Sequence, residues 1–254
     1  MRSVWVIFKR ELAQYFVSPI AYLVAFAILL LISLSFNSDL EQRVLNAQRP
    51  NGTIALTAFA FFMIFFAPLL TMRLLAEEAR EGTLELMFTL PVRDSEIVLG
   101  KFLGAWAYYT VILALTLVYP VIIMMLTTFS DALLHSEMDI GPVIAGYLGI
   151  WLFGGATLAV GLFFSALTEN QIIAGFLSMA TLFILWLGDL AGLLPSSIIS
   201  TELARALRVI SLQAHYSTSF VIGVIRMEDV VFYMGIMAVM LYATMLTLES
   251  RRWR

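Results

Sequence analysis

The sequence contains no cysteine and few charged side chains. Without cysteine, a disulfide framework, a thiolate metal site and a cysteine nucleophile are all excluded. The two histidines, His135 and His215, lie far apart and have no neighbouring ligand pattern, so they do not indicate a metal site. Charged residues make up only 13% of the 254 residues, against about a quarter in a soluble domain. The net charge of -3, without a basic stripe, gives no support for nucleic-acid binding.

Hydrophobic residues are abundant instead, at 61% of the chain. They form six long apolar runs, at about 16–36, 53–75, 101–126, 142–166, 171–193 and 229–248. A helix of about 20 residues crosses the ~30 Å hydrocarbon core, and the short alternating strands of a barrel are absent. The first run has no A-x-A-like cleavage site, so we expect it to be retained. The predicted fold is an all-α integral membrane protein, with residues 1–254 forming one six-span domain.

The distribution of lysine and arginine predicts the orientation of the spans. With both termini in the cytoplasm, ten of the 15 basic residues lie inside and five outside. The inner set is Arg2, Lys9, Arg10, Arg73, Arg80, Arg93, Lys101, Arg251, Arg252 and Arg254. The outer set is Arg43, Arg49, Arg205, Arg208 and Arg226. Positive charge favours the cytoplasmic side of a membrane. We therefore expect the chain to lie in the cell (plasma or inner) membrane, with both termini in the cytoplasm.

Three shorter segments also have helical patterns. Residues 3–16 suit a helix in the inner membrane interface, with Pro19 at the bend into the first span; a plain extension of that span is the alternative. Residues 200–210 have an apolar face and a charged face, which predicts a short amphipathic helix on the outer side. Residues 216–225 are apolar but too short to span, and are compatible with a re-entrant piece.

A polar segment, residues 75–106, separates the second and third spans. Gly82 and Thr83 make a break and an N-cap, which predicts a helix from about Leu84 to Thr89 that ends before Pro91. Apolar side chains on a cytoplasmic loop suit docking into a groove of a partner. Contact with lipid headgroups explains the same composition equally well.

This segment resembles the cytoplasmic loop of ABC-2 type exporter permeases. The resemblance rests on E-E-A-R-E-G-T-L-E, then P-V, then G-K at the third span, and involves Glu77, Glu78, Gly82, Thr83, Glu85, Pro91, Gly100 and Lys101. In that family the loop forms a coupling helix that contacts the ATPase. The resemblance therefore implies an ATPase-coupling set of Glu77, Glu78, Arg80, Gly82, Thr83, Glu85, Leu86, Phe88 and Pro91. The segment 223–231 and the ending L-E-S-R-R-W, residues 248–253, are most similar to the gliding-motility and nitrous-oxide-reductase-accessory branch.

The resemblance also implies the partners. Two permeases pair, as a homodimer or a heterodimer, and two separate ATP-binding subunits dock beneath them. The chain has no G-x-x-x-x-G-K-[ST] motif, since Lys101 is followed by Phe102. We therefore expect ATP and Mg²⁺ on the partner ATPase, and no cofactor, metal or catalytic residue on this chain. The expected function is export or mechanical work driven by that ATPase.

Within the predicted spans, small residues mark close helix contacts. Gly155-x-x-x-Ala159 suits packing within the chain, and Gly188-x-x-x-Gly192 suits either such packing or a dimer contact. Asp189 is the one carboxylate that lies inside a predicted span and not at its first residue, so it is a candidate for the substrate path. Its position near the outer end equally suits simple solvation. Pro68 and Pro120 predict kinks.

Two other functions were weighed. A membrane anchor or assembly factor would recruit a cytoplasmic ATPase without moving cargo, and nothing in the sequence separates it from a transporter. An intramembrane enzyme is disfavoured, because Asp189 has no second carboxylate, Ser–Lys pair or histidine cluster near it in the predicted spans.

Overall fold

The computed structural model describes residues 2–46, 52–89, 92–129, 139–190 and 200–252, and the regular structure in these segments is helical throughout. The helices are α1 (Arg2–Val17), α2 (Pro19–Leu45), α3 (Ile54–Thr71), α4 (Ala76–Arg80), α5 (Thr83–Thr89), α6 (Asp94–Leu115), α7 (Val118–Phe129), α8 (Ile140–Leu167), α9 (Gln171–Leu190), α10 (Thr201–Ile210), α11 (Leu212–Thr218), the 3-10 turn η2 (Phe220–Ile222) and α12 (Met227–Arg252).

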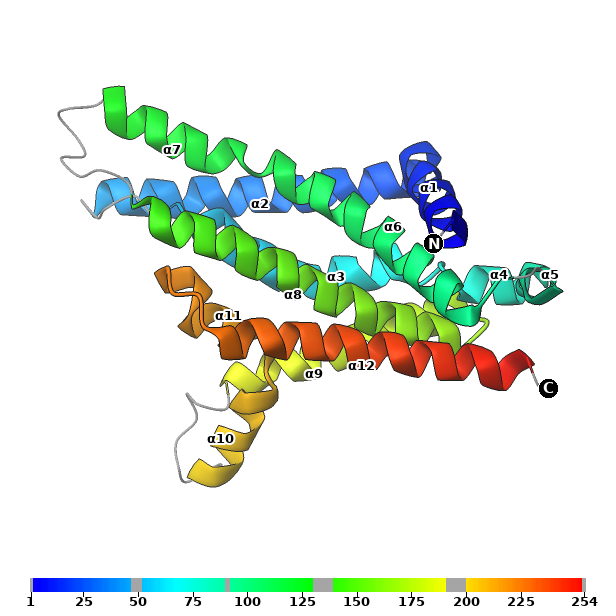
Figure 1. The fold of residues 1–254 in the computed structure, drawn as a ribbon. Coiled ribbons are helices and arrows are strands. Elements are labelled where there is room, and N and C mark those ends of the chain that lie inside the picture. The colour runs from blue at the N-terminus through cyan, green and yellow to red at the C-terminus, as the bar shows by residue number, and fades with distance from the viewer. Residues whose placement is uncertain (1, 47–51, 90–91, 130–138, 191–199, 253–254) are drawn as a thin grey trace.

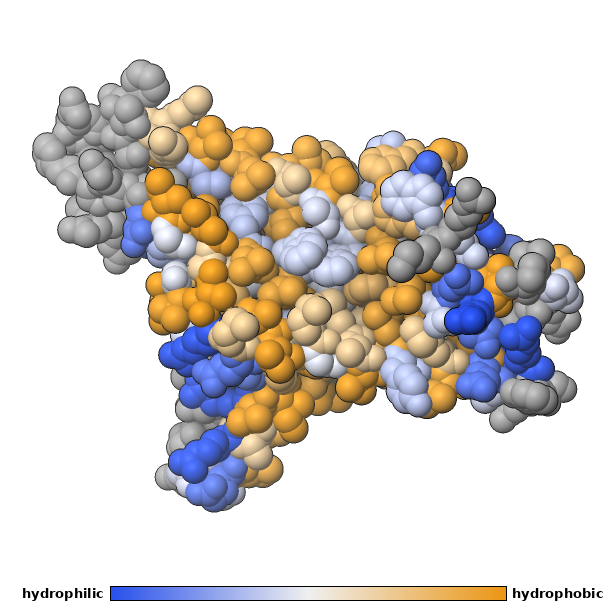
Figure 2. Space-filling model, viewed as in Figure 1, coloured by the Kyte–Doolittle hydropathy of each residue, from blue (hydrophilic) through white to orange (hydrophobic). Residues whose placement is uncertain are grey.

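Six helical stretches are long and apolar enough to cross a membrane, as predicted. They are Pro19–Leu45, Ile54–Arg80, Asp94–Met125, Ile140–Leu167, Gln171–Leu190 and Met227–Arg252. The long helices run side by side, and α4, α5 and both ends of the described chain lie at one end of the bundle (Figure 1). Polar residues gather at the two ends of the molecule, with apolar residues between them (Figure 2). This distribution suits a protein whose middle is in lipid.

Helix α8 is the centre of the bundle. It packs against α3, α6, α9 and α12, and 78% of its most apolar window is buried, against 22% for α9 and for α12. Small residues allow these close approaches: a Cβ at Gly155 would lie 2.7 Å from Met237 Sδ on α12. Tyr109 of α6 donates a hydrogen bond to the Ile150 carbonyl. A helix buried on most of its surface needs no polar face, and α8 has none.

Helix α1 is separate from the first span, as expected. Ser18 is extended, and Pro19 begins α2 at a position where its missing N–H costs nothing. In Figure 1, α1 lies across the direction of the long helices and packs on α6. Its other face carries exposed apolar side chains, among them Trp5 and Val17, which suits a helix at a membrane boundary.

The third span is interrupted where a kink was predicted. Helix α6 ends at Leu115 and α7 begins at Val118, because Pro120 has no N–H to donate and its ring crowds the Thr116 carbonyl. The amide of Tyr119 donates to that carbonyl instead, in a tighter turn. The predicted kink at Pro120 is confirmed as a break between two helices. Pro68 lies inside α3, which continues to Thr71.

At the opposite end of the bundle from α5, short helices fold back between α9 and α12. Helix α10 is amphipathic as predicted and is capped by Ser200. The region of residues 216–225, a candidate re-entrant piece, forms the end of α11 and η2, with Tyr216 and Phe220 buried against the bundle.

A buried polar cluster joins these short helices to α12. Asp229, which is 3% exposed, lies 2.6 Å from His215 Nδ1 and accepts a hydrogen bond from Ser219 at 2.5 Å. His215 Nε2 faces the Val209 carbonyl at 3.0 Å. Although the residue types match a hydrolase triad, the serine hydroxyl binds the carboxylate and not the imidazole. The cluster therefore holds the helix ends together and does not form a nucleophile.

Candidate functional site

The candidate site lies at the end of the bundle formed by α1, α4, α5 and the start of α6. Gly82, with φ +70°, turns the chain between α4 and α5. This left-handed conformation is open to glycine and costly for other residues. Thr83 begins α5, and its hydroxyl donates to the Glu78 carbonyl at 3.3 Å. The predicted helix of residues 84–89 is thus confirmed as α5, with its start fixed by the glycine.

Four charged side chains from three helices form a network next to α5. Lys101 Nζ lies 2.9 Å from Glu11 Oε1 and 2.8 Å from Glu78 Oε1. Arg10 Nη2 lies 3.0 Å from the same oxygen of Glu78. Lys101 is 1% exposed and Glu11 3%, so water screens this pair little. Lys101, Glu11 and Glu78 are buried, and the half-exposed Arg10 supplies the second positive charge that balances the two glutamates.

The network ties the polar loop to the rest of the protein. Glu11 and Arg10 belong to α1, Glu78 to α4 and Lys101 to α6. Opposite charges in a space that excludes water favour one arrangement of these three helices, since moving any of them separates a buried pair. A movement of α4 would therefore be passed to α1 and α6.

A serine from the central helix holds the junction between α3 and α4. Ser165 Oγ of α8 accepts hydrogen bonds from the amides of Leu75 and Ala76, at 3.0 and 3.1 Å, and donates to the Met72 carbonyl at 2.9 Å. These groups would otherwise lose their helical partners at the break. A side chain inserted in this way is a common cause of a bend in a helix. Ser165 thus joins the α4–α5 loop to the core of the bundle.

Aromatic contacts fix α1 against the same junction. Tyr15 donates a hydrogen bond to the Leu70 carbonyl at 2.6 Å and stacks on Tyr108, with ring centroids 4.8 Å apart. Burial raises the pKa of the Tyr15 hydroxyl well above its usual value, so it remains a neutral donor. Arg73 lies over the Tyr15 ring and donates to Ser18 at 2.9 Å. Helix α1 is therefore held at both its polar and its aromatic residues.

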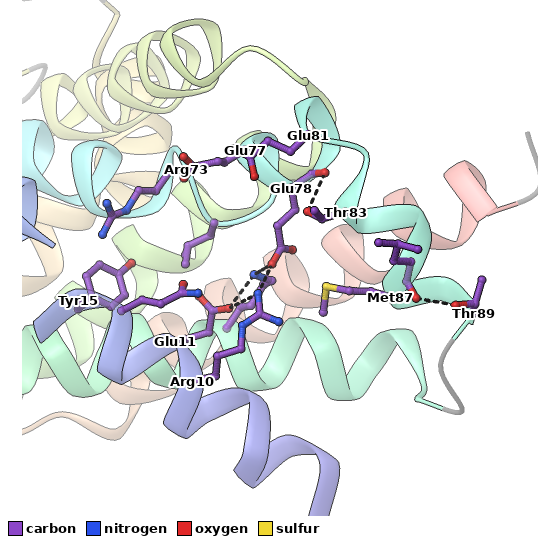
Figure 3. A pocket seen from close by; sticks show the side chains of 14 residues that line it. Arg10, Glu11, Tyr15, Arg73, Glu77, Glu78, Glu81, Thr83, Met87 and Thr89 are labelled. Atoms are coloured by element: carbon purple, nitrogen blue, oxygen red, sulfur yellow. Dashed lines mark hydrogen bonds and ion pairs between the residues drawn. The ribbon is translucent and has the colours of Figure 1, made fainter. Parts of the chain in front are cut away.

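A hollow of about 740 Å³ opens between α1 and the α4–α5 loop. Figure 3 shows its lining: the ion network lies between α1 and α4, with Glu77 and Glu81 on α4 and the turn after it, and Thr83, Met87 and Thr89 on α5. Leu86 also lines it and is 66% exposed. The surface around α5 thus combines carboxylates with exposed apolar groups.

Comparison with known families identifies the chain. Residues 33–250, most of its length, match the family described as ABC-2 family transporter protein. The chain belongs to this family. Among curated proteins, none matches it. As an ABC-2 permease, it is a membrane component of a transporter and not itself the catalytic subunit, and the family associates with an ATPase subunit. The resemblance inferred from the 77–101 segment is confirmed for the family.

The expected coupling residues of this permease occupy different environments. Glu77 is partly exposed, Arg80, Gly82 and Leu86 are exposed, and Thr83 supports the turn. Glu78 is 8% exposed and serves the internal network, so its Oε1 is not open to a partner. The side chains of Glu85 and Phe88, and the whole of Pro91, lie outside the described part of the chain.

The small residues and the intramembrane carboxylate also have defined places. Gly155 and Ala159 are buried within the chain on α8. Gly188 faces the junction of α10 and α11, where a Cβ would lie 2.6 Å from the Leu207 carbonyl; Gly192 is outside the described residues. Asp189 lies 3.8 Å from Arg208 of α10, and its side chain is 26% exposed. This pair at the end of α9 gives Asp189 a structural partner.

Sequence reasoning missed the charged network. Ile7, Glu11 and Tyr15 are spaced by four residues and share the face of α1 that packs on α6. That spacing places a carboxylate on an apolar face, which is the available signal in the sequence for a buried partner. Lys101 was predicted as an inner-side charge and as part of the family motif, but not as a buried ion-pair partner. Its two carboxylate partners lie 90 and 23 residues away, beyond any local pattern.

Proposed function

We propose that this ABC-2 permease is the membrane subunit of an exporter, and that separate cytoplasmic ATPase subunits dock on α5. ATP and Mg²⁺ belong to those subunits. The observation that carries the proposal is the placement of α5: it presents an exposed Leu86, and it follows an α4 that is joined to α1 and α6 by buried charges. A force applied at α5 reaches three helices through rigid contacts, as mechanical coupling requires.

The mechanism follows from these connections. Binding of ATP draws the two ATPase subunits together, and each moves the α5 that it contacts. Helix α4 then moves α1 and α6 through the Glu78–Lys101–Glu11 contacts, and moves α8 through Ser165. Helices α3 and α6, which belong to the second and third spans, tilt relative to the central helix and change the access to the path between the protomers.

Docking on α5 is tested by co-purification with the ATPase. Replacing the exposed Leu86 with Asp puts a charge where an apolar contact is expected, and should reduce the recovered ATPase by roughly 30-fold, the loss expected for a contact worth about 2 kcal/mol. The control is Leu203→Asp on α10, an exposed leucine at the other end of the bundle. Equal recovery with both variants would contradict the proposal. ATPase that binds but is neither stimulated nor linked to export would favour the anchor function.

We also propose that the permease works as a dimer, paired along α2 and α9. Both helices pack on α3, yet only 28% and 22% of their apolar windows are buried within the chain. Such surfaces are covered by lipid or by a second copy. Because the chain has no cysteine, single cysteines report the contact directly. Ile184→Cys on α9 should crosslink in membranes and Val121→Cys on α7 should not; the reverse result would place the interface elsewhere.

Two finer features complete the proposal. We propose that the protein lies in the inner membrane with both termini and α5 in the cytoplasm; the excess of basic residues at that end supports this orientation. Within the family, we propose that the chain belongs to the gliding-motility and nitrous-oxide-reductase-accessory branch. Only the similarity of residues 223–231 and 248–253 supports this assignment. Deletion of the gene followed by assays of gliding motility and of nitrous-oxide reduction tests it, and a deletion strain that keeps both properties would reject it.

A further inference from the structure

The hollow between α1 and the α4–α5 loop has an excess of negative charge at its mouth. Arg10 and Lys101 are matched by Glu11 and Glu78, and Arg73 is directed to Ser18. Glu77 and Glu81 also line the hollow, and neither has an ion-pair partner among the described residues. The lining as a whole contains four carboxylates and three cations, Arg73 included, and its net charge of one negative unit favours a cation.

A buried carboxylate oxygen beside the hollow has no partner. Glu78 lines the hollow and is 8% exposed. Its Oε1 is shared by Arg10 and Lys101, but its Oε2 is buried and accepts no hydrogen bond. Buried polar atoms are normally satisfied by protein, water or a ligand. Glu78 therefore keeps one oxygen without a donor, and this oxygen adds to the negative potential that Glu77 and Glu81 produce in the hollow.

The rest of the lining decides the kind of donor. Leu74, Leu86 and Met87 supply an apolar wall next to the carboxylates. A long side chain with an aliphatic stem and a cationic head matches both parts, because arginine and lysine bury the stem and direct the head to polar groups. A bare metal ion does not match, since no group of three metal-binding side chains is present in the described segments. Leu86 belongs both to this wall and to the surface proposed to dock the ATPase, so the two sites are continuous.

We propose that the hollow receives an arginine or lysine side chain of the ATPase subunit. Its cationic head lies beside the carboxylates of Glu77 and Glu81, and its stem lies along Leu86 and Met87. The inserted cation adds one positive charge beside the network that joins α1, α4 and α6, so docking and the arrangement of these helices become linked. This inference rests on the proposed function, because it takes the occupant from the ATPase.

The test uses the full-length permease in lipid nanodiscs and the ATPase subunit that co-purifies with it. The variant carries Glu77→Gln and Glu81→Gln together, which removes the charge at the mouth and leaves the buried network intact. We expect its affinity for the ATPase to fall about tenfold or more, with a weaker dependence on salt. The control is Glu249→Gln, an exposed glutamate of α12, whose affinity should match the wild type.

A charge exchange identifies the inserted residue. Glu81→Arg should weaken binding, and changing one basic residue of the ATPase to glutamate should restore it. Affinity of the double glutamine variant within twofold of the wild type would overturn the inference. If Leu86→Asp still releases the ATPase in that case, the docking proposal survives and only the cation site fails. If the wild-type permease captures no ATPase at all, both proposals fail.

Discussion

At the scale of single residues, the end of the permease that holds α1, α4 and α5 depends on buried charged side chains and their ion-pair partners. Lys101 is the extreme case, a lysine 1% exposed between two glutamates. Replacing a whole buried ion pair with apolar residues of similar size often costs a protein little stability. Removing only one member is destabilising, because it leaves a buried charge unmatched. Such residues specify an arrangement of helices more than they stabilise it.

Replacing Lys101 with Met should destabilise the protein by about 3–5 kcal/mol, because Glu11 and Glu78 would share only Arg10. The measurement is thermal unfolding of the purified permease in detergent. Adding Glu11→Gln to this variant restores the balance of charge, and should recover part of the loss. Lys9→Met, which changes an exposed lysine of α1, serves as the control; a loss no larger than that of the control would show that the network is not buried as described.

Ser165→Ala should cost about 1–3 kcal/mol, since it leaves the Leu75 and Ala76 amides without their acceptor. Ser178 of α9 offers a matched control, because its hydroxyl is also buried but has no hydrogen-bond partner. Ser178→Ala should therefore be close to neutral. Both variants are compared by thermal unfolding, and by the rate of ATP hydrolysis in the assembled complex. An equal effect of the two changes on both measurements would exclude a role for Ser165 at the α3–α4 junction.

At the scale of elements, breaks between helices position the site. The α3–α4 break, the Gly82 turn and the α6–α7 break divide the second span, the loop after it and the third span into shorter helices. Each break has a local cause: an inserted serine, a left-handed glycine and a proline. The break at Gly82 and the break at Pro120 could be predicted from the sequence. The α3–α4 break could not, because Ser165 acts on it from another helix.

The Gly82 turn makes a prediction with an internal control. A Cβ at Gly82 would meet nothing within 4 Å, so Gly82→Ala tests the backbone alone. The left-handed φ should make it destabilising by about 1 kcal/mol. Gly235 of α12 is also free of neighbours but lies inside a helix, so Gly235→Ala should be neutral or stabilising by up to about 1 kcal/mol. The measurement is the thermal unfolding temperature of both variants. A loss of stability of similar size in both would contradict the left-handed turn at Gly82.

At the scale of the whole molecule, the bundle has two different ends. One end holds α1, α4, α5 and a buried ion network, and the other holds α10, α11 and the Asp229 cluster (Figure 1). Residues that couple to an ATPase belong at the cytoplasmic end. The proposed function therefore requires a particular orientation in the membrane.

Labelling in intact cells tests this orientation. The cysteine-free chain allows single cysteines at exposed positions on either end, such as Arg80→Cys and Glu202→Cys. A maleimide that does not cross the membrane should label Glu202→Cys in intact cells, and should label Arg80→Cys only after lysis. The opposite pattern would reverse the orientation and remove α5 from the cytoplasm.

The sequence by itself determined the class of fold, the six spans and the α5 helix. These features depend on local properties: a run of about 20 apolar residues must be helical in lipid, and a glycine with a left-handed φ turns the chain between one helix and the next. The family also followed from a contiguous motif. Only the tertiary structure decided which charges are buried together, because Glu11, Glu78 and Lys101 meet through the packing of α1, α4 and α6. The neighbours of a residue in the sequence do not determine which distant residues it meets. Glu78, which was predicted to contact an ATPase, pairs in the structure with Arg10 and Lys101 and joins α4 to α1 and α6.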